Sequence, residues 1–137
     1  MGAPVDCERC PRLVASRRMV VNGAGPQPAD VLVIAQNPGA KEEDPVNGYP
    51  LYEHAWSGSR LRKKLMPRAG IDPMRVRYEN VVRCRPPRKP GGGGDYTPTT
   101  NELEQCRGYL QDAIHKTAPK IIITLGQPAL RWFFPDM

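Results

Sequence analysis

The sequence of 137 residues is long enough for one domain with a substantial core and too short for two ordinary domains. Its hydrophobic content of 39% and charged content of 25% are typical of a soluble globular chain, and no apolar stretch approaches the roughly 20 residues that span a bilayer. Two early cysteines and no apolar segment beside them give no sign of a signal peptide, so we expect a cytoplasmic protein without a membrane partner.

Basic residues exceed acidic ones, with 20 Lys and Arg against 14 Asp and Glu, and the net charge is +6. This excess favours an anionic partner such as nucleic acid, with a merely basic soluble protein as an equal alternative. The basic side chains gather in two segments, Arg60, Arg62, Lys63, Lys64 and Arg68, and Arg83, Arg85, Arg88 and Lys89. These segments are the candidates for contacts with phosphates.

Strand and helix patterns alternate along the chain. After a cysteine-bearing N-terminal segment, the predicted elements are a strand at 31–35, a loop at 36–57, a helix near 58–69, a strand around 77–83, a loop at 84–98, a helix from about 100, a strand at 120–126 and a helix from 127. This order predicts an α/β fold, a three-layer α/β/α sandwich with a mainly parallel central sheet, formed by residues 1–137 as a single domain.

Two of these elements carry sharp local signals. Thr100 is the expected N-cap of the long helix, with Glu102 and Glu104 in its first turn, and apolar residues then recur at helical spacing. The run "KIIITLG" at 120–126 is apolar without a break and ends at a glycine. Such a run predicts a strand that is buried on both faces.

Amides follow the predicted strands at the ends where ligands bind in parallel sheets. The stretch "VIAQNPGAKEED" takes a buried strand straight into Gln36 and Asn37, and amides at such an exit are costly to bury without a polar partner. Asn80 stands near the end of the next strand. The alternatives are structural, with Asn37 forming a turn before proline and Asn80 closing its strand.

Four cysteines have spacing that indicates a metal site. Cys7 and Cys10 form a C-x-x-C pair, whereas Cys84 and Cys106 stand apart. Four thiolates without a histidine partner suit either a four-iron four-sulfur (4Fe-4S) cluster or an all-thiolate zinc site. The alternative is that Cys84 and Cys106 are buried apolar residues and the C-x-x-C pair is a coincidence.

Four motifs carry a resemblance to a known family. The runs "CERCPRLVASRRMVVNGAG", "NVVRCRPP", "TPTTNELEQC" and "IIITLGQPAL" occur in this order. Together they resemble the iron–sulfur uracil-DNA glycosylases, families 4 and 5 of the uracil-DNA glycosylase superfamily, from Cys7 to about Phe134. "CPRLV" is similar to family 5, and the "ED" after "PG" is similar to family 4. The resemblance implies hydrolysis of the N-glycosidic bond of uracil in DNA, for base excision repair, and a 4Fe-4S cluster on the four cysteines.

The resemblance also implies roles for single residues. The loop from Gln36 to Gly39 faces the flipped nucleotide, where Asn37 orients the attacking water and Gln36 replaces the family 4 carboxylate. Asn80 matches the asparagine that reads the uracil edge. Leu51 falls where the family stacks a phenylalanine on uracil, so either Tyr52 or Tyr49 takes over or stacking is lost.

The end of the family pattern has no counterpart before Met137. The superfamily's last motif, a His-Pro-Ser loop, stabilises the departing uracil anion, and neither His54 nor His115 is followed by proline and serine. The final strand of the sheet is missing as well. We therefore expect weakened excision from single-stranded or mismatched uracil-containing DNA. The alternatives are a non-catalytic iron–sulfur module that binds nucleic acid or senses redox state, and one part of a split or shortened enzyme whose C-terminal segment a second chain supplies.

Overall fold

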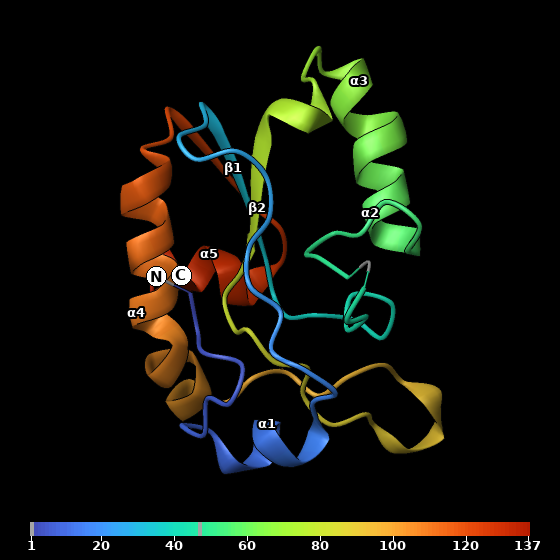
Figure 1. The fold of residues 1–137 in the computed structure, drawn as a ribbon, viewed down its shortest axis with the longest axis vertical. Coiled ribbons are helices and arrows are strands. Elements are labelled where there is room, and N and C mark those ends of the chain that lie inside the picture. Colours follow the sequence, from blue (N-terminus) through green and yellow to red (C-terminus); the bar gives the residue numbers. More distant parts are fainter. Residues whose placement is uncertain (1, 47) are drawn as a thin grey trace.

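The computed structural model describes residues 2–46 and 48–137, and this part of the chain folds around a parallel three-stranded sheet (Figure 1). The strands in chain order are β1 (Val31–Ala35), β2 (Val76–Asn80) and β3 (Ile121–Thr124). β1 is central, and the spatial order is β2-β1-β3. The predicted α/β class with a parallel sheet is thereby confirmed.

Helices connect and cover these strands. In chain order they are α1 (Pro11–Ser16), α2 (Trp56–Arg60), α3 (Met66–Arg68), α4 (Thr100–Thr117) and α5 (Gln127–Phe133). A π-helical turn at Leu61–Leu65 joins α2 to α3, so the helix predicted near 58–69 forms as one continuous helical segment. Within the described residues, none of the helices is long and apolar enough to cross a membrane.

Apolar side chains pack on both faces of the sheet. The core on one face joins the sheet to the α2–α3 segment and includes Val33, Leu51, Leu61, Met66, Val76 and Tyr78. The core on the other face joins it to α4 and α5 and includes Leu32, Ile34, Val81, Leu110 and Ala129. Successive residues of β1 alternate between the two cores, as the pleat of a strand requires. Figure 1 shows α4 and the α2–α3 segment on opposite sides of the strands, which makes the three predicted layers.

The prediction for β3 was wrong in one respect, because this strand is not buried on both faces. Ile121 is 57% exposed and Ile122 is 37% exposed. The physical reason is its position at the edge of the sheet, since among the described residues β3 pairs with β1 alone and the flanking helices pack mainly against β1 and β2. The opposite edge differs, because Ala24 exchanges backbone hydrogen bonds with Tyr78 of β2. One edge of the sheet is therefore covered and the other is open.

The cap of the long helix α4 lies one residue before the predicted N-cap. Thr99, not Thr100, is the cap, and its hydroxyl accepts a hydrogen bond from the backbone N–H of Glu102 at 3.1 Å. The Glu102 carboxylate accepts in return from the Thr99 N–H at 2.9 Å, which completes a capping box. Arg12 of α1 binds the same carboxylate at 2.6 Å. The start of α4 is thus fixed both by its own cap and by α1.

Candidate functional site

The carboxyl edge of the sheet brings the predicted amides close together. The register of the parallel pair sets Ala35 of β1 beside Asn80 of β2. The chain keeps this pairing just beyond the strands, because the Val82 N–H donates to the Gln36 carbonyl at 3.2 Å. The loop that starts at Gln36 and the end of β2 therefore meet at one place on the sheet edge.

The amides of Gln36 and Asn37 are held by each other and by a carboxylate. Gln36 Nε2 donates to Asn37 Oδ1 at 2.8 Å. Asn37 Nδ2 donates to the Pro38 carbonyl at 2.9 Å and to Asp95 Oδ2 at 3.4 Å. Both amides are half-buried, which leaves them accessible to a ligand. The Asn37 side chain thus has a fixed orientation, and a carboxylate lies within reach of it.

Asp95 belongs to a network of charges around this loop. Arg85 donates to both of its carboxylate oxygens, and the shortest distance is 3.0 Å. The hydrogen bond that Arg85 donates to Asp95 raises the pKa of Arg85. Glu43 accepts from the Arg18 backbone N–H at 2.6 Å and lies 3.9 Å from the Arg85 guanidinium. These pairs connect the loop after β1 with the loop between β2 and α4.

Asn80 is a buried amide without a hydrogen-bond partner. It is 1% exposed, and neither Nδ2 nor Oδ1 makes a hydrogen bond of good geometry within the described residues. Most buried polar groups in proteins are paired, and an unpaired one destabilises the fold by about 1–3 kcal/mol. The Asn80 amide therefore has unused capacity for a ligand, and the ligand can reach it only when neighbouring side chains move.

A charged neighbour of this amide is Glu42, which was not predicted from the sequence. Glu42 is 8% exposed, and its Oε1 also lacks a partner. Burial raises the pKa of Glu42 to about 7, while the nearby Leu51 backbone and Asn80 amide oppose this rise. The only signal in the sequence was the acidic pair Glu42-Glu43 in a loop, which is more often a solvated feature.

Leu51 and Tyr52 lie in different surroundings. Leu51 is 4% exposed, packs in the core against the α2–α3 segment, and has a left-handed backbone with φ of 55°. Its carbonyl accepts from Arg62 Nε at 2.6 Å. Tyr52 packs edge-to-face against Tyr49 and His54, with ring centroids 5.1 and 5.3 Å apart, beside a hollow of about 340 Å³. Gly39 lies in the same loop as Gln36 and Asn37, and its carbonyl accepts from the Glu42 N–H at 3.1 Å.

A larger cavity of about 630 Å³ opens between α4 and α5. Gln36 lines it from the sheet edge, and Arg107 and Arg131 line it from the two helices. The Arg107 guanidinium lies 4.4 Å from the centre of the Trp132 ring. Sequence reasoning missed this cavity because its walls come from segments far apart in the chain.

The four cysteines converge near α1. Cys10, Cys84 and Cys106 are buried in one cluster, Cys7 packs against it, and all four are free thiols. Burial raises the pKa of Cys10 to about 11, and it raises the pKa of Cys84 and Cys106 as well. Within residues 2–46 and 48–137, no three or more Cys, His, Asp or Glu side chains have the geometry of a metal site.

Polar groups also approach two of the sulfurs. Arg17 Nη1 donates to Cys84 Sγ at 3.6 Å, and the Tyr109 hydroxyl lies 3.6 Å from Cys7 Sγ. The contact with Arg17 opposes the rise that burial causes in the pKa of Cys84, because a hydrogen bond to sulfur favours the ionised form.

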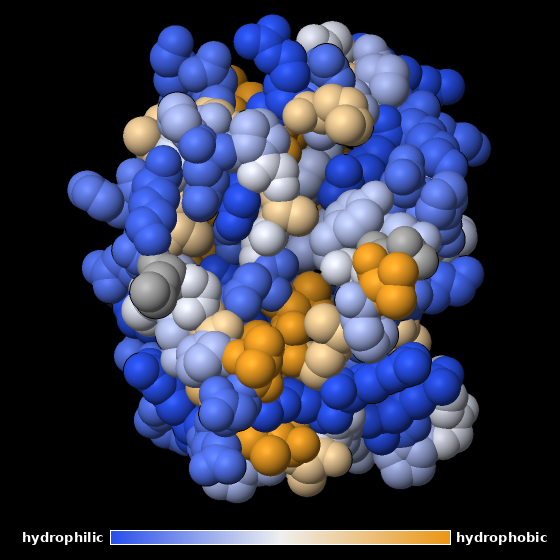
Figure 2. All heavy atoms as spheres, in the orientation of Figure 1, coloured by the Kyte–Doolittle hydropathy of each residue, from blue (hydrophilic) through white to orange (hydrophobic). Residues whose placement is uncertain are grey.

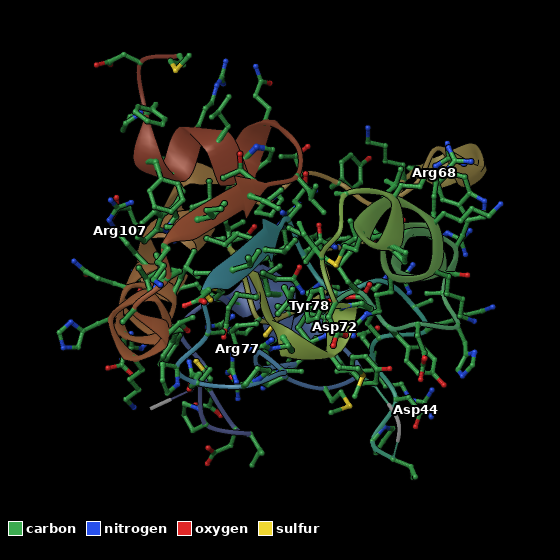
Figure 3. All side chains as sticks on the ribbon, turned by 90° about the horizontal axis from the view of Figure 1, so that it is seen from above. Asp44, Arg68, Asp72, Arg77, Tyr78 and Arg107 are labelled. Carbon is green, nitrogen blue, oxygen red and sulfur yellow. The ribbon has the colours of Figure 1, made fainter. Side chains whose placement is uncertain are left out.

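Three of the basic residues predicted to contact phosphates are used inside the molecule. Arg62 lies 3.7 Å from the centre of the Tyr78 ring, Arg83 is 2% exposed and pairs with Glu79, and Arg85 pairs with Asp95. The remaining members of the two segments are at least partly exposed, namely Arg60, Lys63, Lys64, Arg68, Arg88 and Lys89. Figure 3 shows Arg68 at the outer side of the α2–α3 layer and Tyr78 inside the molecule.

The sequence matches the family described as the uracil DNA glycosylase superfamily over residues 22–136. It is similar to the type-4 uracil-DNA glycosylase of Sulfurisphaera tokodaii, with 30% identity over 97% of this chain and 56% of that protein. It is 33% identical to the type-4 uracil-DNA glycosylase of Thermotoga maritima over 93% of this chain and 60% of that protein. The chain thus spans a little over half the length of these relatives. The match over most of its length shows that the chain belongs to the uracil DNA glycosylase superfamily.

Proposed function

We propose that this chain recognises uracil in DNA and hydrolyses its N-glycosidic bond, with single-stranded or mismatched DNA as the substrate. The observation that carries the proposal is the buried, unpaired amide of Asn80 at the sheet edge, next to the amide-bearing loop after β1. An amide offers a donor and an acceptor side by side, which complements the imide N–H and carbonyl of uracil. A base reaches such a site only after it leaves the helical stack.

Asn37 is the residue proposed to orient the attacking water. The Gln36 side chain fixes one end of its amide, and the contact with Asp95 fixes the other. Neither amide can accept the proton of the water, and general-base assistance is typically worth about 10²–10⁴-fold in rate. We therefore propose slow hydrolysis. The Gly39 carbonyl accepts a hydrogen bond from the Glu42 N–H. Leu51 and Tyr52 are the proposed contacts for the base.

We propose that Cys7, Cys10, Cys84 and Cys106 hold a 4Fe-4S cluster, with zinc as the alternative metal. The burial of three thiols in one cluster and the Arg17 and Tyr109 contacts to sulfur support this assignment. A bound cluster would join α1, the loop after β2 and α4, and would supply a structural link with redox capacity. Iron and acid-labile sulfide analysis after anaerobic purification distinguishes the two, because one zinc and no sulfide would exclude the cluster.

A second chain is proposed to complete the site. The open edge of β3, with Ile121 and Ile122 exposed, supports pairing with a further strand. Exposed apolar strand edges readily pair with other chains. The strand from the second chain would carry a hydrogen-bond donor for the departing uracil anion. This donor matters because loss of one preorganised donor typically reduces the rate of catalysis by about 10²–10³-fold.

The second candidate function is DNA binding without catalysis. The specific observation that favours it is the chemistry of the site, since Gln36 stands in place of a carboxylate and Leu51 is packed in the core. Under this alternative the exposed basic side chains bind DNA and the amides have no catalytic role.

Release of free uracil from a labelled single-stranded oligonucleotide separates the two candidates. We expect slow release by the unmodified chain, and a further loss of at least about tenfold in both Asn37→Ala and Asn80→Ala. The matched control is Asn101→Ala, which removes an exposed amide at the start of α4. If no uracil is released under single-turnover conditions with excess protein, the result supports DNA binding without catalysis. If uracil is released and neither substitution changes the rate, the site lies elsewhere.

A further inference from the structure

We propose that the segment from Tyr52 to Arg60 is a binding surface for single-stranded DNA, whose unpaired bases stack on the aromatic rings of this segment. The inference rests on the proposed function for the identity of the ligand, DNA, and extends it to the bases that flank the target base. The aromatic side chains are Tyr52, His54 and Trp56, which stand at every second position. We call these three residues the aromatic track.

The rings of the aromatic track reach the surface of the molecule. Trp56 is 78% exposed, whereas tryptophan side chains are highly buried on average. The His54 side chain is 60% exposed. Tyr52 is half-buried, and its ring packs edge-to-face against both Tyr49 and His54. The track therefore presents ring surface to solvent, where a planar ligand can reach it.

Backbone contacts hold the start of the aromatic track in place. Arg62 donates from Nε to the Leu51 carbonyl at 2.6 Å and from Nη2 to the Pro50 carbonyl at 3.0 Å. Gly58 lies so close to the Leu51 and Tyr52 carbonyls that a Cβ atom at its position would clash with them. Rings on a fixed backbone lose little conformational freedom when a ligand binds, and this preorganisation favours affinity.

The hollow of about 340 Å³ beside the track fits a nucleobase better than a phosphate. Its volume is within the range of about 300–1,000 Å³ that is typical of small-ligand sites. The rings of Tyr49, Tyr52 and His54 line it, together with the acidic residue Glu53. A carboxylate repels a phosphate, whereas it accepts hydrogen bonds from the N–H groups of a base. Rings and an acceptor in one hollow therefore suit a base.

Basic side chains follow the aromatic track on the helical segment that Trp56 begins. The Arg60 guanidinium lies 5.9 Å from the centre of the Trp56 ring, within the range of a cation–π contact. Lys63 and Lys64 are exposed one turn further along. Proteins that bind single strands combine rings that stack on bases with cations that follow the phosphates. The bases of a duplex already stack on one another, so this surface favours a single strand.

The track belongs to the same loop as the proposed catalytic amides. This loop leaves the carboxyl end of β1 at Gln36 and reaches α2 at Trp56, whereas α3 precedes the amino end of β2. Figure 1 accordingly shows α2 nearer than α3 to the carboxyl ends of the strands. A DNA strand whose target base enters at the sheet edge therefore has neighbouring bases within reach of the track.

Binding of a uracil-free single strand of about 10 nucleotides tests the inference, with a duplex of the same sequence for comparison. We expect Trp56→Leu to weaken binding of the single strand by about tenfold, as the loss of one base–aromatic stack typically does, and binding of the duplex by less than about twofold. Trp56→Tyr keeps a ring and should stay within about threefold of the unmodified chain. The matched control is Phe134→Leu, which removes a 56% exposed ring just after α5 and should have no effect.

Two further measurements identify stacking as the cause. The tryptophan fluorescence of the unmodified chain should fall as the single strand binds, and this fall should be absent in Trp56→Leu, whose remaining tryptophan is the half-buried Trp132. The dependence of binding on salt should be the same in Trp56→Leu as in the unmodified chain, because stacking releases no counterions.

The outcomes separate this inference from the proposed function, because the probe contains no uracil. Unchanged binding of the single strand by Trp56→Leu, or an equal loss for single strand and duplex, would overturn the inference. If uracil is nevertheless released in the assay described above, the proposed function stands without the track. If Trp56 behaves as expected and no uracil is released, the track is supported and the proposed hydrolysis is overturned.

Discussion

At the scale of single residues, burial of the Glu42 carboxyl group makes the stability of the fold depend on pH. The pKa of its carboxyl group is about 7 in the folded chain and 4.5 in its ordinary state. The folded chain therefore binds more protons than the unfolded chain between these pH values. Its stability falls as pH rises through this window, and the loss is complete above the folded-state pKa.

Glu42→Gln should remove this dependence. The variant should be more stable than the unmodified chain, and its advantage in the free energy of unfolding should be larger at about pH 8 than at about pH 5. This advantage should differ between the two pH values by on the order of 3 kcal/mol or less, because one pKa unit corresponds to about 1.4 kcal/mol. Urea denaturation at both pH values measures the difference. Parallel pH profiles of the two proteins would show that Glu42 titrates normally.

The candidate residues were predictable to different degrees. Gln36, Asn37 and Asn80 could be selected from the sequence because strand ends in parallel sheets are recognisable positions. Glu42 and Asp95 could not, because a carboxylate in a loop is usually solvated and only the fold reveals its neighbours. Arg62 shows the opposite error. Its place in a basic segment predicted a contact with DNA phosphates, whereas in the structure its guanidinium donates a hydrogen bond to the Leu51 carbonyl.

At the scale of elements, α4 offers a sharp test of local sequence chemistry. Two adjacent threonines precede Asn101, and only Thr99 has Glu102 three residues later to complete a capping box. Thr99→Ala should lower the free energy of unfolding by about 1 kcal/mol, since it removes the cap. Thr100→Ala is the matched control and should change it by less than about 0.5 kcal/mol. Urea denaturation, monitored by circular dichroism, measures the free energy of unfolding of both variants. A larger decrease in Thr100→Ala than in Thr99→Ala would mean that the cap is misassigned.

The existence of the strand β3 could be predicted from the sequence, but its exposure could not. An unbroken apolar run predicted the strand correctly, and the pattern also indicated cover on both faces. Burial depends on which segments pack against the strand, and the described chain provides β1 on one side alone. Exposed Ile121 and Ile122 are therefore the part of the fold for which the sequence pattern and the structure disagree.

At the scale of the whole molecule, the exposed members of the two predicted basic segments lie over two regions. Figure 2 shows hydrophilic surface over the α2–α3 segment and over the loop that precedes α4. Lys63 and Lys64 are exposed in the first region, and each phosphate contact contributes a counterion-release slope of about 0.7–0.9. The double substitution of both lysines by alanine should therefore weaken DNA binding for all sequences and reduce the salt slope by about 1–2.

Fluorescence anisotropy between about 50 and 200 mM salt measures this slope. The matched control is Lys116→Ala with Lys120→Ala, which removes the same charge from the opposite, amino-terminal end of β3. An equal effect of the two double variants would mean that net charge alone, and no defined surface, attracts the DNA.

The central claim is that uracil is read at the carboxyl ends of β1 and β2. The most direct measurement is a nuclear magnetic resonance titration of the ¹⁵N-labelled chain with a strand that carries 2′-fluoro-2′-deoxyuridine, against the same strand with cytosine at that position. The account predicts shifts specific to uracil in the Asn80 side-chain amide and in the backbone amides of Gln36, Asn37 and Gly39. Uracil-specific shifts confined to the cavity between α4 and α5, or identical shifts with both strands, would contradict it.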